Sequence, residues 1–259
     1  MGKKYRVEGK GKRTIVFVHY FGGDARSWQW VVKRLKKKYT CVLLNLPGFG
    51  GTPPLAEPSI YEFASYINTC ISELQLKDYI LCGHSMGAKL ALYAAKLAKE
   101  AKPTKIVLIA PSPPTVEHMS DEEKERMLKH PNRAEAINTV NGATVKPLSK
   151  PKFDHAVSSQ LIIDPATWRW WLNQGMDHSI ANRIKDLDME VTVIYSKKDP
   201  VIPESAIFTE VLPYIKNPST ITLGKVGHLI PMEAPKKLSR QLHRILKRDI
   251  AKENKADMV

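Results

Sequence analysis

The stretch Tyr79–Ala98, which reads YILCGHSMGAKLALYAAKLA, decides the fold. Its apolar run stops at Gly83, and a segment rich in alanine and leucine follows Gly87. A short apolar run that ends in glycine predicts a buried strand, and the alanine-rich segment predicts a closely packed helix. Ser85 stands at the turn between them. The pattern Gly-x-Ser-x-Gly between a strand and a helix is typical of a sharp turn that exposes a nucleophilic serine.

The two glycines of this turn have a steric role. A side chain at Gly83 or Gly87 would collide with the adjoining strand and helix, because the turn brings them close together. The helix that begins after Ser85 also directs its positive end toward developing negative charge. We expect the neighbouring His84 to be structural and to face away from Ser85. We expect Lys89, on the same helix, to be solvated.

A serine hydroxyl becomes a nucleophile when a base removes its proton and a carboxylate orients that base. Asp199 follows the β-rich run of VIYSKKDPVIP, and His228 follows the last strand-like run, in GKVGHLIPMEAP. The chain order serine, acid, histidine is the order associated with this type of turn. Glu233 is expected to anchor the histidine loop. The segment PSPP, which follows the strand predicted over residues 105–110, contains no carboxylate, so Asp199 remains the candidate acid.

The rest of the chain alternates between strand and helix patterns, which favours an α/β fold whose mostly parallel sheet of about seven strands is flanked by helices. The helix patterns lie at 60–74, 86–101, 203–212 and 235–250. The strand-like runs are Lys4–Glu8, Thr14–His19, Thr40–Leu46, Tyr79–Cys82, Lys105–Ala110, Val191–Ser196 and Ser219–Leu223. Sites in such sheets lie beyond the carboxyl ends of the strands.

Residues 111–188 interrupt this alternation, because they contain helix signals and no convincing strand. Ser120 with Glu123 forms a capping-box pattern, and Asp164 precedes a proline suited to the first turn of a helix. Gly175 is a suitable end for that second helix. We therefore predict a helical cap at 111–188, inserted in a core formed by 1–110 and 189–259.

The sequence resembles the α/β-hydrolase superfamily, in particular its capped, esterase-like serine hydrolases, over essentially the whole chain, and five features carry the resemblance. They are the VHYFGGD loop, the segment NLPGFGGT, the Ser85 turn, Asp199 with its following proline, and the segment GHLIPMEAP. The resemblance implies a catalytic triad of Ser85, Asp199 and His228 that requires no metal and no cofactor. It is poorly specific for substrate, because one fold carries many reactions.

The resemblance also gives a role to the loop VHYFGGD at Val18–Asp24. An acyl-transfer serine needs backbone donors at the place where the oxyanion forms. The resemblance implies that these donors are the N–H groups of Phe21 and Met86. Family members usually have glycine where this chain has Tyr20, so we expect a negative φ there. The Tyr20 side chain either packs under the cap or contacts substrate.

The cap sequence TWRWWL places Trp168 and Trp171 on one helix face, with Trp170 directed elsewhere. Aromatic side chains there either line an apolar substrate pocket or form the core that a small helical insertion needs. The sequence leaves both interpretations open.

The formal net charge of +14 is concentrated in Lys33–Lys38 and Lys236–Lys255. A basic surface can bind nucleic acid, but no nucleic-acid motif accompanies these runs, so a solvated surface is expected. Cys41, Cys70 and Cys82 fit neither a disulfide framework nor a zinc site. We expect no membrane span and a cytoplasmic location, because the N-terminal apolar run is too short for a signal peptide. No pattern predicts the oligomeric state.

We therefore expect a serine hydrolase that cleaves an ester or related acyl bond of a small, apolar substrate through an acyl-enzyme on Ser85. A carbon–carbon bond hydrolase, a lactonase or a perhydrolase-like enzyme would use the same triad. A receptor of this fold with slow turnover would also retain it. These alternatives remain open at the level of sequence.

Overall fold

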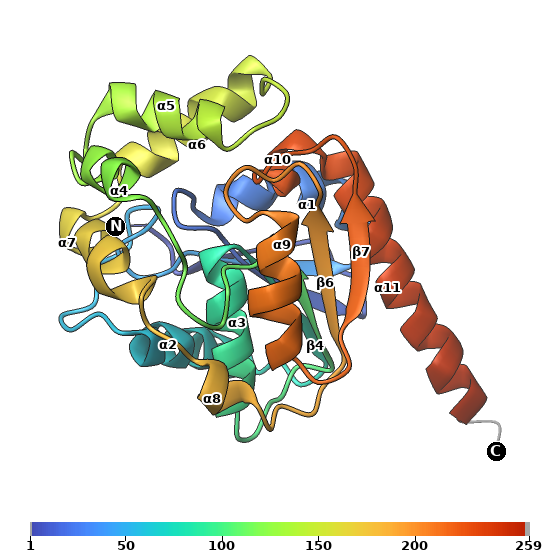
Figure 1. Ribbon diagram of the computed structural model, residues 1–259. Helices are drawn as coiled ribbons and strands as arrows, with labels where there is room; N and C mark the ends of the chain where they lie inside the picture. The colour runs from blue at the N-terminus through green and yellow to red at the C-terminus, as the bar shows by residue number, and fades with distance from the viewer. Residues whose placement is uncertain (1, 257–259) are drawn as a thin grey trace.

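In a computed structural model, the chain forms one sheet covered by helices on both faces (Figure 1). The structure describes residues 2–256, and it describes side chains as far as Lys247. The strand order is β1-β3-β2-β4-β5-β6-β7, and the pair β1–β3 is antiparallel while every other pair is parallel. The strands are β1 (Tyr5–Glu8), β2 (Thr14–Val18), β3 (Thr40–Leu44), β4 (Tyr79–His84), β5 (Lys105–Ile109), β6 (Val191–Ser196) and β7 (Ser219–Leu223). The predicted fold class is confirmed.

Alternate residues of the strands face opposite sides of the sheet, and each side has its own helices. Val16 and Val18 face the cluster that contains α2 (Ile60–Glu73) and α3 (Met86–Leu97). Ile15 and Phe17 face the cluster that contains α1 (Gln29–Leu35) and α11 (Pro235–Ala256). Both faces are apolar, which is why the central strands β2 to β5 are mostly hydrophobic, whereas the edge strands β1 and β7 contain exposed polar residues.

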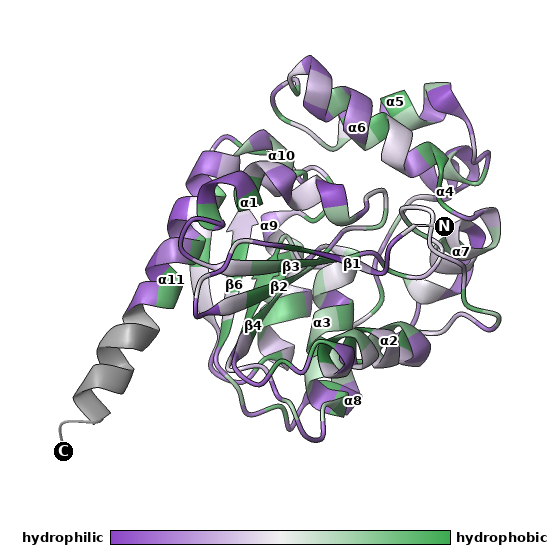
Figure 2. Ribbon diagram, turned by 180° about the vertical axis from the view of Figure 1, so that it is seen from behind, coloured by the Kyte–Doolittle hydropathy of each residue, from purple (hydrophilic) through white to green (hydrophobic). Residues whose placement is uncertain are grey.

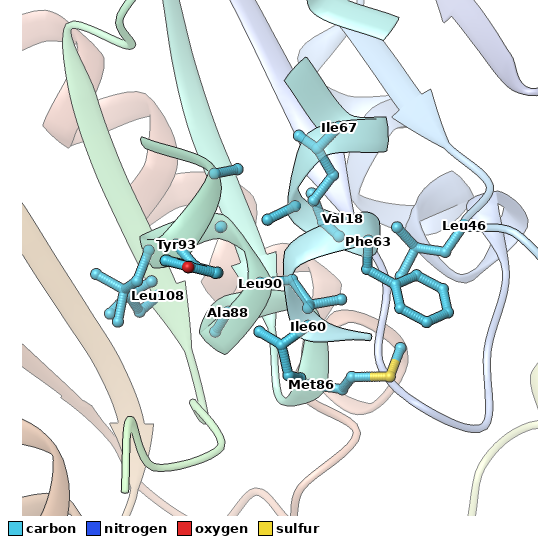
Figure 3. Close-up of a cluster of buried hydrophobic side chains, with 14 of the residues drawn as sticks. Val18, Leu46, Ile60, Phe63, Ile67, Met86, Ala88, Leu90, Tyr93 and Leu108 are labelled. Atoms are coloured by element: carbon cyan, nitrogen blue, oxygen red, sulfur yellow. The ribbon is translucent and has the colours of Figure 1, made fainter. Parts of the chain in front are cut away.

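Figure 3 shows the cluster on the α2–α3 side. Met86, the first residue of α3, lies beside Ile60 and Phe63 of α2. The Met86 side chain is 1% exposed, so it belongs to the core. The residue that follows the serine therefore fixes the start of α3 with its side chain and leaves its backbone N–H at the turn.

Figure 2 shows hydrophilic residues along α1 and α11, and many of the exposed ones are basic. In α1 and the turn after it, the exposed basic residues are Lys33, Arg34, Lys36, Lys37 and Lys38. In α11 they are Lys236, Lys237, Arg240, Arg244 and Lys247. The basic side chains predicted after Lys247 lie outside the described residues. In the described part of the chain, no helix combines the length and the apolar character that a membrane span requires.

Between β5 and β6 the chain forms helices and no strand, all of it within the described residues; we call residues 111–188 the helical segment (Figure 1). Its helices are α4 (Asp121–Met127), α5 (Arg133–Gly142), α6 (Lys150–Leu161), α7 (Pro165–Trp170) and α8 (Ala181–Ile184). Both predicted N-caps are present: the Ser120 hydroxyl accepts from the Glu123 N–H, and the Asp164 carboxylate accepts from the Thr167 N–H, although Ser120 and Glu123 form only this half of a capping box. A π-helical turn, Trp171–Gly175, ends at the predicted glycine. The division into a core and a cap with the predicted boundaries stays a prediction.

Several element boundaries differ from the prediction, and two of them belong to the strand and the helix that flank Ser85. Strand β4 continues to His84, two residues beyond the predicted end, because it pairs with β5 as far as Ile109. Helix α3 ends at Leu97, short of the predicted residue 101, because Ala98 adopts an extended backbone with φ −62° and ψ 122°. The extension of β4 brings it directly up to Ser85.

Candidate active site

Ser85 lies at the carboxyl end of β4, in a turn with a strained backbone. Its φ is 53° and its ψ is −121°, a combination that side-chain-bearing residues rarely adopt. A Cβ atom at Gly83 would lie 2.3 Å from the carbonyl oxygen of Gly87, and one at Gly87 would lie 2.4 Å from that of His19. The steric role predicted for both glycines is therefore present in the structure.

His228 and Asp199 reach Ser85 from the loops after β7 and β6. His228 Nε2 lies 2.9 Å from Ser85 Oγ, and His228 Nδ1 lies 2.9 Å from Asp199 Oδ2. The other carboxylate oxygen of Asp199 accepts hydrogen bonds from the N–H groups of Val201 and Ile202, both at 2.9 Å. The structure thus brings the three predicted residues together, in a line of two hydrogen bonds.

The electrostatics of this line favour a basic imidazole. Burial lowers the pKa of His228, but the charge and hydrogen bond of Asp199, with a contribution from the charge of Glu117, outweigh burial and raise the pKa above its ordinary value. The Asp199 carboxylate accepts a hydrogen bond from the Nδ1–H of His228, which leaves the lone pair of Nε2 directed at the serine hydroxyl. The arrangement can remove the proton of Ser85.

The loop after β2, residues 19–24, lies next to the Ser85 turn because β2 pairs with β4. We call it the His19 loop. In the described part of the chain, nothing accepts a hydrogen bond from the N–H of Phe21 or of Met86. Two unoccupied N–H groups on adjoining strand-end loops are what a developing oxyanion requires.

His19 fixes the peptide unit that carries the Phe21 N–H. Its Nε2 accepts from the Leu46 N–H at 3.2 Å, so the proton is on Nδ1, which donates to the Tyr20 carbonyl oxygen at 2.8 Å. Burial lowers the pKa of His19 to about 4, so the ring stays neutral. The C=O and N–H of one peptide unit point in opposite directions, so holding the Tyr20 oxygen also orients the Phe21 N–H.

Tyr20 adopts no left-handed conformation; the non-glycine residues with positive φ in the described chain are Gln75, Ser85, Ala110, Asn217 and Lys225. This agrees with the expectation from sequence. The Tyr20 ring is 8% exposed and lies 5.2 Å from the ring of His84, centroid to centroid. It packs in a cluster that includes Val140 of α5 and Leu229.

A cavity of about 660 Å³ lies between the strand-end loops and the helical segment. Ser85 and His228 line it together with Tyr20, Phe21, Trp168 and Trp171, while Trp170 is not among its lining residues. Trp168 stacks on Phe21 at 4.2 Å and on His130 at 4.4 Å, centroid to centroid. The two tryptophans therefore pack in the interior and also form cavity wall, so the two interpretations left open by the sequence do not exclude each other.

The helical segment is hydrogen-bonded to the His19 loop and to the loop that carries His228. The Ser159 hydroxyl donates to the Gly22 carbonyl oxygen at 3.1 Å, and the His228 N–H donates to the Ala143 carbonyl oxygen at 2.8 Å. Glu233 accepts from the N–H groups of Gly227, Val145 and Lys146, so it joins the histidine loop to the segment. The expectation that Glu233 anchors the histidine loop is confirmed. The position of the helical segment is thereby coupled to the geometry of the site.

Two expectations about the neighbours of Ser85 are wrong. His84 does not face away from the site: its Nε2 lies 2.9 Å from the His228 carbonyl oxygen, and the two rings are 5.1 Å apart. Lys89 is not solvated: it is 0% exposed, and its ammonium donates to the Thr115 carbonyl oxygen at 2.8 Å. The chain after β5 folds over the start of α3 and covers Lys89.

Sequence reasoning missed Glu117, which lines the cavity and is 8% exposed. It follows the carboxylate-free segment PSPP by three residues. A carboxylate between an apolar strand and a helix start carries no periodic signal. In the described chain, no group of three or more His, Cys, Asp or Glu side chains has an arrangement that could hold a metal ion.

Comparison with known proteins gives a consistent result. Residues 15–241 match the alpha/beta hydrolase family. Over 258 residues the chain is 26% identical to the uncharacterized hydrolase YugF of Bacillus subtilis, and the match covers 92% of this chain and 91% of that protein. Over 201 residues it is 27% identical to the pimeloyl-[acyl-carrier protein] methyl ester esterase of Legionella pneumophila, covering 75% of this chain and 79% of that protein.

Another match is partial. The dihydrolipoyllysine-residue acetyltransferase component of the acetoin cleaving system of Cupriavidus necator is 34% identical over 108 residues, which are 41% of this chain and 28% of that protein. Among solved structures, the esterase EaEST of Exiguobacterium antarcticum superposes with a TM-score of 0.86 at 17% identity, covering 94% of each chain. That likeness concerns the fold.

Proposed function

Because this chain belongs to the α/β-hydrolase family, we propose that it is a carboxylesterase-like serine hydrolase, which cleaves an ester or related acyl bond of a small, largely apolar substrate. The observation that carries this proposal is the line from Ser85 Oγ through His228 to Asp199, with both hydrogen bonds at 2.9 Å. A nucleophile, a base within hydrogen-bond reach and a carboxylate that orients the base are the requirements for acyl transfer through serine.

In the proposed reaction, Ser85 Oγ attacks the substrate carbonyl carbon while His228 Nε2 takes the hydroxyl proton. Asp199 keeps the imidazole oriented and stabilises its positive charge. The carbonyl π electrons move to the oxygen, which becomes an anion facing the N–H groups of Phe21 and Met86. When the tetrahedral intermediate collapses, the bond to the leaving group breaks and His228 returns the proton to that group.

The acyl group then remains on Ser85, and water completes the cycle. His228 takes a proton from the water, whose oxygen attacks the acyl carbon. The second tetrahedral intermediate releases the acid, and Ser85 recovers its proton. These steps balance with water as the sole co-reactant, and this chain supplies every group that they use.

The choice of an ester is supported by the name of a relative, a methyl ester esterase, and by the chemistry of the cavity wall. Aromatic side chains from the His19 loop and the helical segment suit an apolar group on the substrate. We propose that the helical segment acts as a cap, which sets the length of the chain that fits. Epoxide hydrolases and haloalkane dehalogenases of this fold use aspartate as the nucleophile, and residue 85 is serine.

We also propose a small molecule as the partner and the cytoplasm as the location. Three buried cysteines without disulfides support a reducing compartment. The aromatic wall and the helices above it favour a small substrate that enters the cavity.

The test is chemical labelling followed by turnover. A fluorophosphonate probe should label Ser85, and both Ser85→Ala and His228→Ala should lower ester turnover by at least about 10³-fold. A panel of p-nitrophenyl esters and lactones would then report the preferred chain length. Full activity in Ser85→Ala would refute the mechanism. Labelling of Ser85 without turnover of any ester or lactone would favour a receptor, and turnover of carbon–carbon substrates alone would favour that class of hydrolase.

A further inference from the structure

The wall of the cavity contains a carboxylate that the proposed mechanism does not use. Glu117 lies in the chain between β5 and α4, and it lines the same cavity as Ser85 and His228. It is 8% exposed. Placing an ionised carboxylate in such a site costs free energy unless a partner compensates for its lost hydration. The contacts of Glu117 therefore indicate which kind of group it can bind.

Two hydrogen bonds hold Glu117 in place, and a third joins its partner Ser112 to Ser85. The buried Ser112 hydroxyl donates a short hydrogen bond to Oε2, and the Ser112 N–H donates to the Ser85 carbonyl oxygen at 3.2 Å. The Glu117 N–H donates to the Met176 carbonyl oxygen at 2.9 Å. Glu117 is therefore fixed relative to Ser85 through a single intervening residue.

Lys89 supplies the nearest buried positive charge, but it is not positioned to neutralise Glu117 directly. Burial lowers the pKa of Lys89 to about 8, against the opposing charges of Glu117 and Asp177. Its ammonium donates to the carbonyl oxygens of Thr115 and, at 3.5 Å, of Met176. No ion pair joins Lys89 to Glu117 among the described residues, and Lys89 does not line the cavity.

One oxygen of the carboxylate is left over. In the part of the chain that the structure describes, no group donates a hydrogen bond to Glu117 Oε1. Carboxylate oxygens accept hydrogen bonds and donate none when ionised. The unused oxygen in a cavity wall is thus an acceptor for a donor that the substrate brings.

The other charged groups of the cavity do not favour an anionic substrate. Glu123 and Glu210 also line it and add negative charge. Arg126 is the cationic guanidinium in the lining, and it already donates to Glu135 at 3.0 Å and to Glu123 at 3.3 Å. A substrate carboxylate would meet Glu117 without an uncommitted guanidinium to compensate for the repulsion.

We propose that Glu117 is a substrate-recognition residue, and that the natural substrate is an ester carrying a hydrogen-bond donor, an ammonium or hydroxyl group, on the part that does not react. The aromatic wall binds the apolar part and Glu117 Oε1 accepts the donor. A carboxylate at the same position is disfavoured. This inference rests on the proposed function, because it concerns the substrate of the same site.

The experiment compares esters that differ in one terminal group. Two series of p-nitrophenyl or acetyl esters place a methyl, hydroxyl, ammonium or carboxylate group on the acyl side or on the alcohol side. In the series that reaches Glu117, kcat/KM should be higher for ammonium than for carboxylate by about tenfold or more, the scale of one charge-assisted hydrogen bond. Glu117→Gln should reduce that ratio about tenfold, because the amide oxygen can still accept from Ser112 while the charge is gone.

Glu123→Gln is the matched control. It removes one negative charge from the same cavity, but from a carboxylate that already pairs with Arg126. Its effect on the ammonium-to-carboxylate ratio should be smaller than that of Glu117→Gln. Equal effects in the two variants would overturn the assignment to Glu117, as would an unchanged ratio in a folded Glu117→Gln protein.

A binding measurement separates this inference from the proposed function. Calorimetry with matched non-hydrolysable amides and the Ser85→Ala variant should give the same order, with ammonium tighter than carboxylate, and Glu117→Gln in that background should abolish the order. If the ammonium compound binds more tightly than the carboxylate compound, but the unmodified protein hydrolyses no ester, then the role of Glu117 is supported and the proposed hydrolase activity is not. Turnover with no preference in either assay would count against Glu117 alone.

Discussion

The Ser85 turn and the His19 loop lie side by side at the ends of β4 and β2, and each adjoins an N–H group that has no acceptor among the described residues, yet they are built differently. The Ser85 turn is shaped by its own backbone, with φ of 53° at Ser85 and glycines on both sides. The His19 loop contains no residue with positive φ. Its shape comes from hydrogen bonds: the Tyr20 carbonyl oxygen accepts from His19 and from the Gly23 N–H, and that of Gly22 accepts from Ser159 of α6.

This difference teaches where each loop is vulnerable. A turn fixed by steric exclusion fails when atoms are added within it or against the backbone that it touches, as at Gly87 beside the His19 carbonyl oxygen. A loop fixed by hydrogen bonds fails when a partner is removed, wherever in the chain that partner lies. We therefore expect the damaging substitutions to be added side-chain atoms in the Ser85 turn and lost hydrogen-bond partners in the His19 loop.

Gly83→Ala should have the largest effect on folding. The new Cβ would lie 2.3 Å from the Gly87 carbonyl oxygen and 2.5 Å from the Ala88 Cα, both backbone atoms that cannot move without displacing α3. We expect a loss of about 3 kcal/mol in the free energy of unfolding, which lowers Tm by roughly 6–12 °C, with loss of activity. Thermal denaturation would measure it.

Gly224→Ala is the matched control, because a Cβ atom there meets nothing within 4 Å. Its Tm should stay within about 2 °C of the parent. An equally small change in Gly83→Ala would show that steric exclusion does not shape the Ser85 turn.

The same difference explains what the sequence could predict. The Ser85 turn is a local pattern, so the roles of Gly83, Ser85 and Gly87 can be predicted from a few adjacent residues. The alternation of strand and helix patterns predicts the parallel sheet. Asp199 and His228 are readable because each follows a strand whose end lies at the same edge. These predictions need only the chain order and the sheet geometry.

The failures all involve contacts between segments that are distant in sequence. Lys89 would be exposed if α3 stood alone, but it is buried in the protein because residues around Thr115 cross over it. His84 bonds the carbonyl oxygen of His228, which lies 144 positions away in the sequence. Glu117 enters the cavity because an irregular segment folds back toward Ser85. No periodicity within a short window carries that information.

His19→Ala tests the loop that depends on partners. The change removes the side-chain donor to the Tyr20 carbonyl oxygen, which keeps the Gly23 N–H at 3.1 Å, and leaves the Leu46 N–H without its acceptor. We expect kcat to fall about 10²-fold, because the Phe21 N–H loses its orientation toward the oxyanion. KM should change much less, since the cavity wall is intact. Steady-state kinetics on the best ester of the panel would measure both constants.

His19→Asn is the informative partner of that variant. An asparagine amide can donate to the Tyr20 carbonyl oxygen from nearly the position of Nδ1, but it does not reach Leu46. It should recover about tenfold of the lost kcat. If both variants lose activity equally, then the bond to Tyr20 is not what positions the loop.

The pH dependence of kcat/KM separates the two histidines. His228 must be neutral to accept the serine proton, and its pKa is raised by Asp199 above the ordinary value of 6.5. The acid limb should therefore have its midpoint above pH 6.5, and activity should fall about tenfold per pH unit below it. His19, with a pKa of about 4, stays neutral through that range and contributes no step.

Glu117→Gln offers a control for that profile, because the charge of Glu117 also raises the pKa of His228. The midpoint should move to lower pH in the variant, by less than in Asp199→Asn. A midpoint below pH 6 in the unmodified protein would contradict the assignment of the limb to His228 paired with an ionised Asp199.

Tyr20→Phe should have the smallest effect, and it tests how far the His19 loop depends on side chains. The ring packs against His84 and in the cluster with Val140, and the substitution keeps that ring. We expect kcat within about twofold of the parent, whereas Tyr20→Ala should cost about 3 kcal/mol in the free energy of unfolding through lost packing. A change in kcat of more than tenfold in Tyr20→Phe would place the hydroxyl against the substrate. In that case the His19 hydrogen bond would set the geometry of the loop, and the Tyr20 hydroxyl would set its selectivity. In the Ser85 turn, by contrast, the glycines have a steric role only.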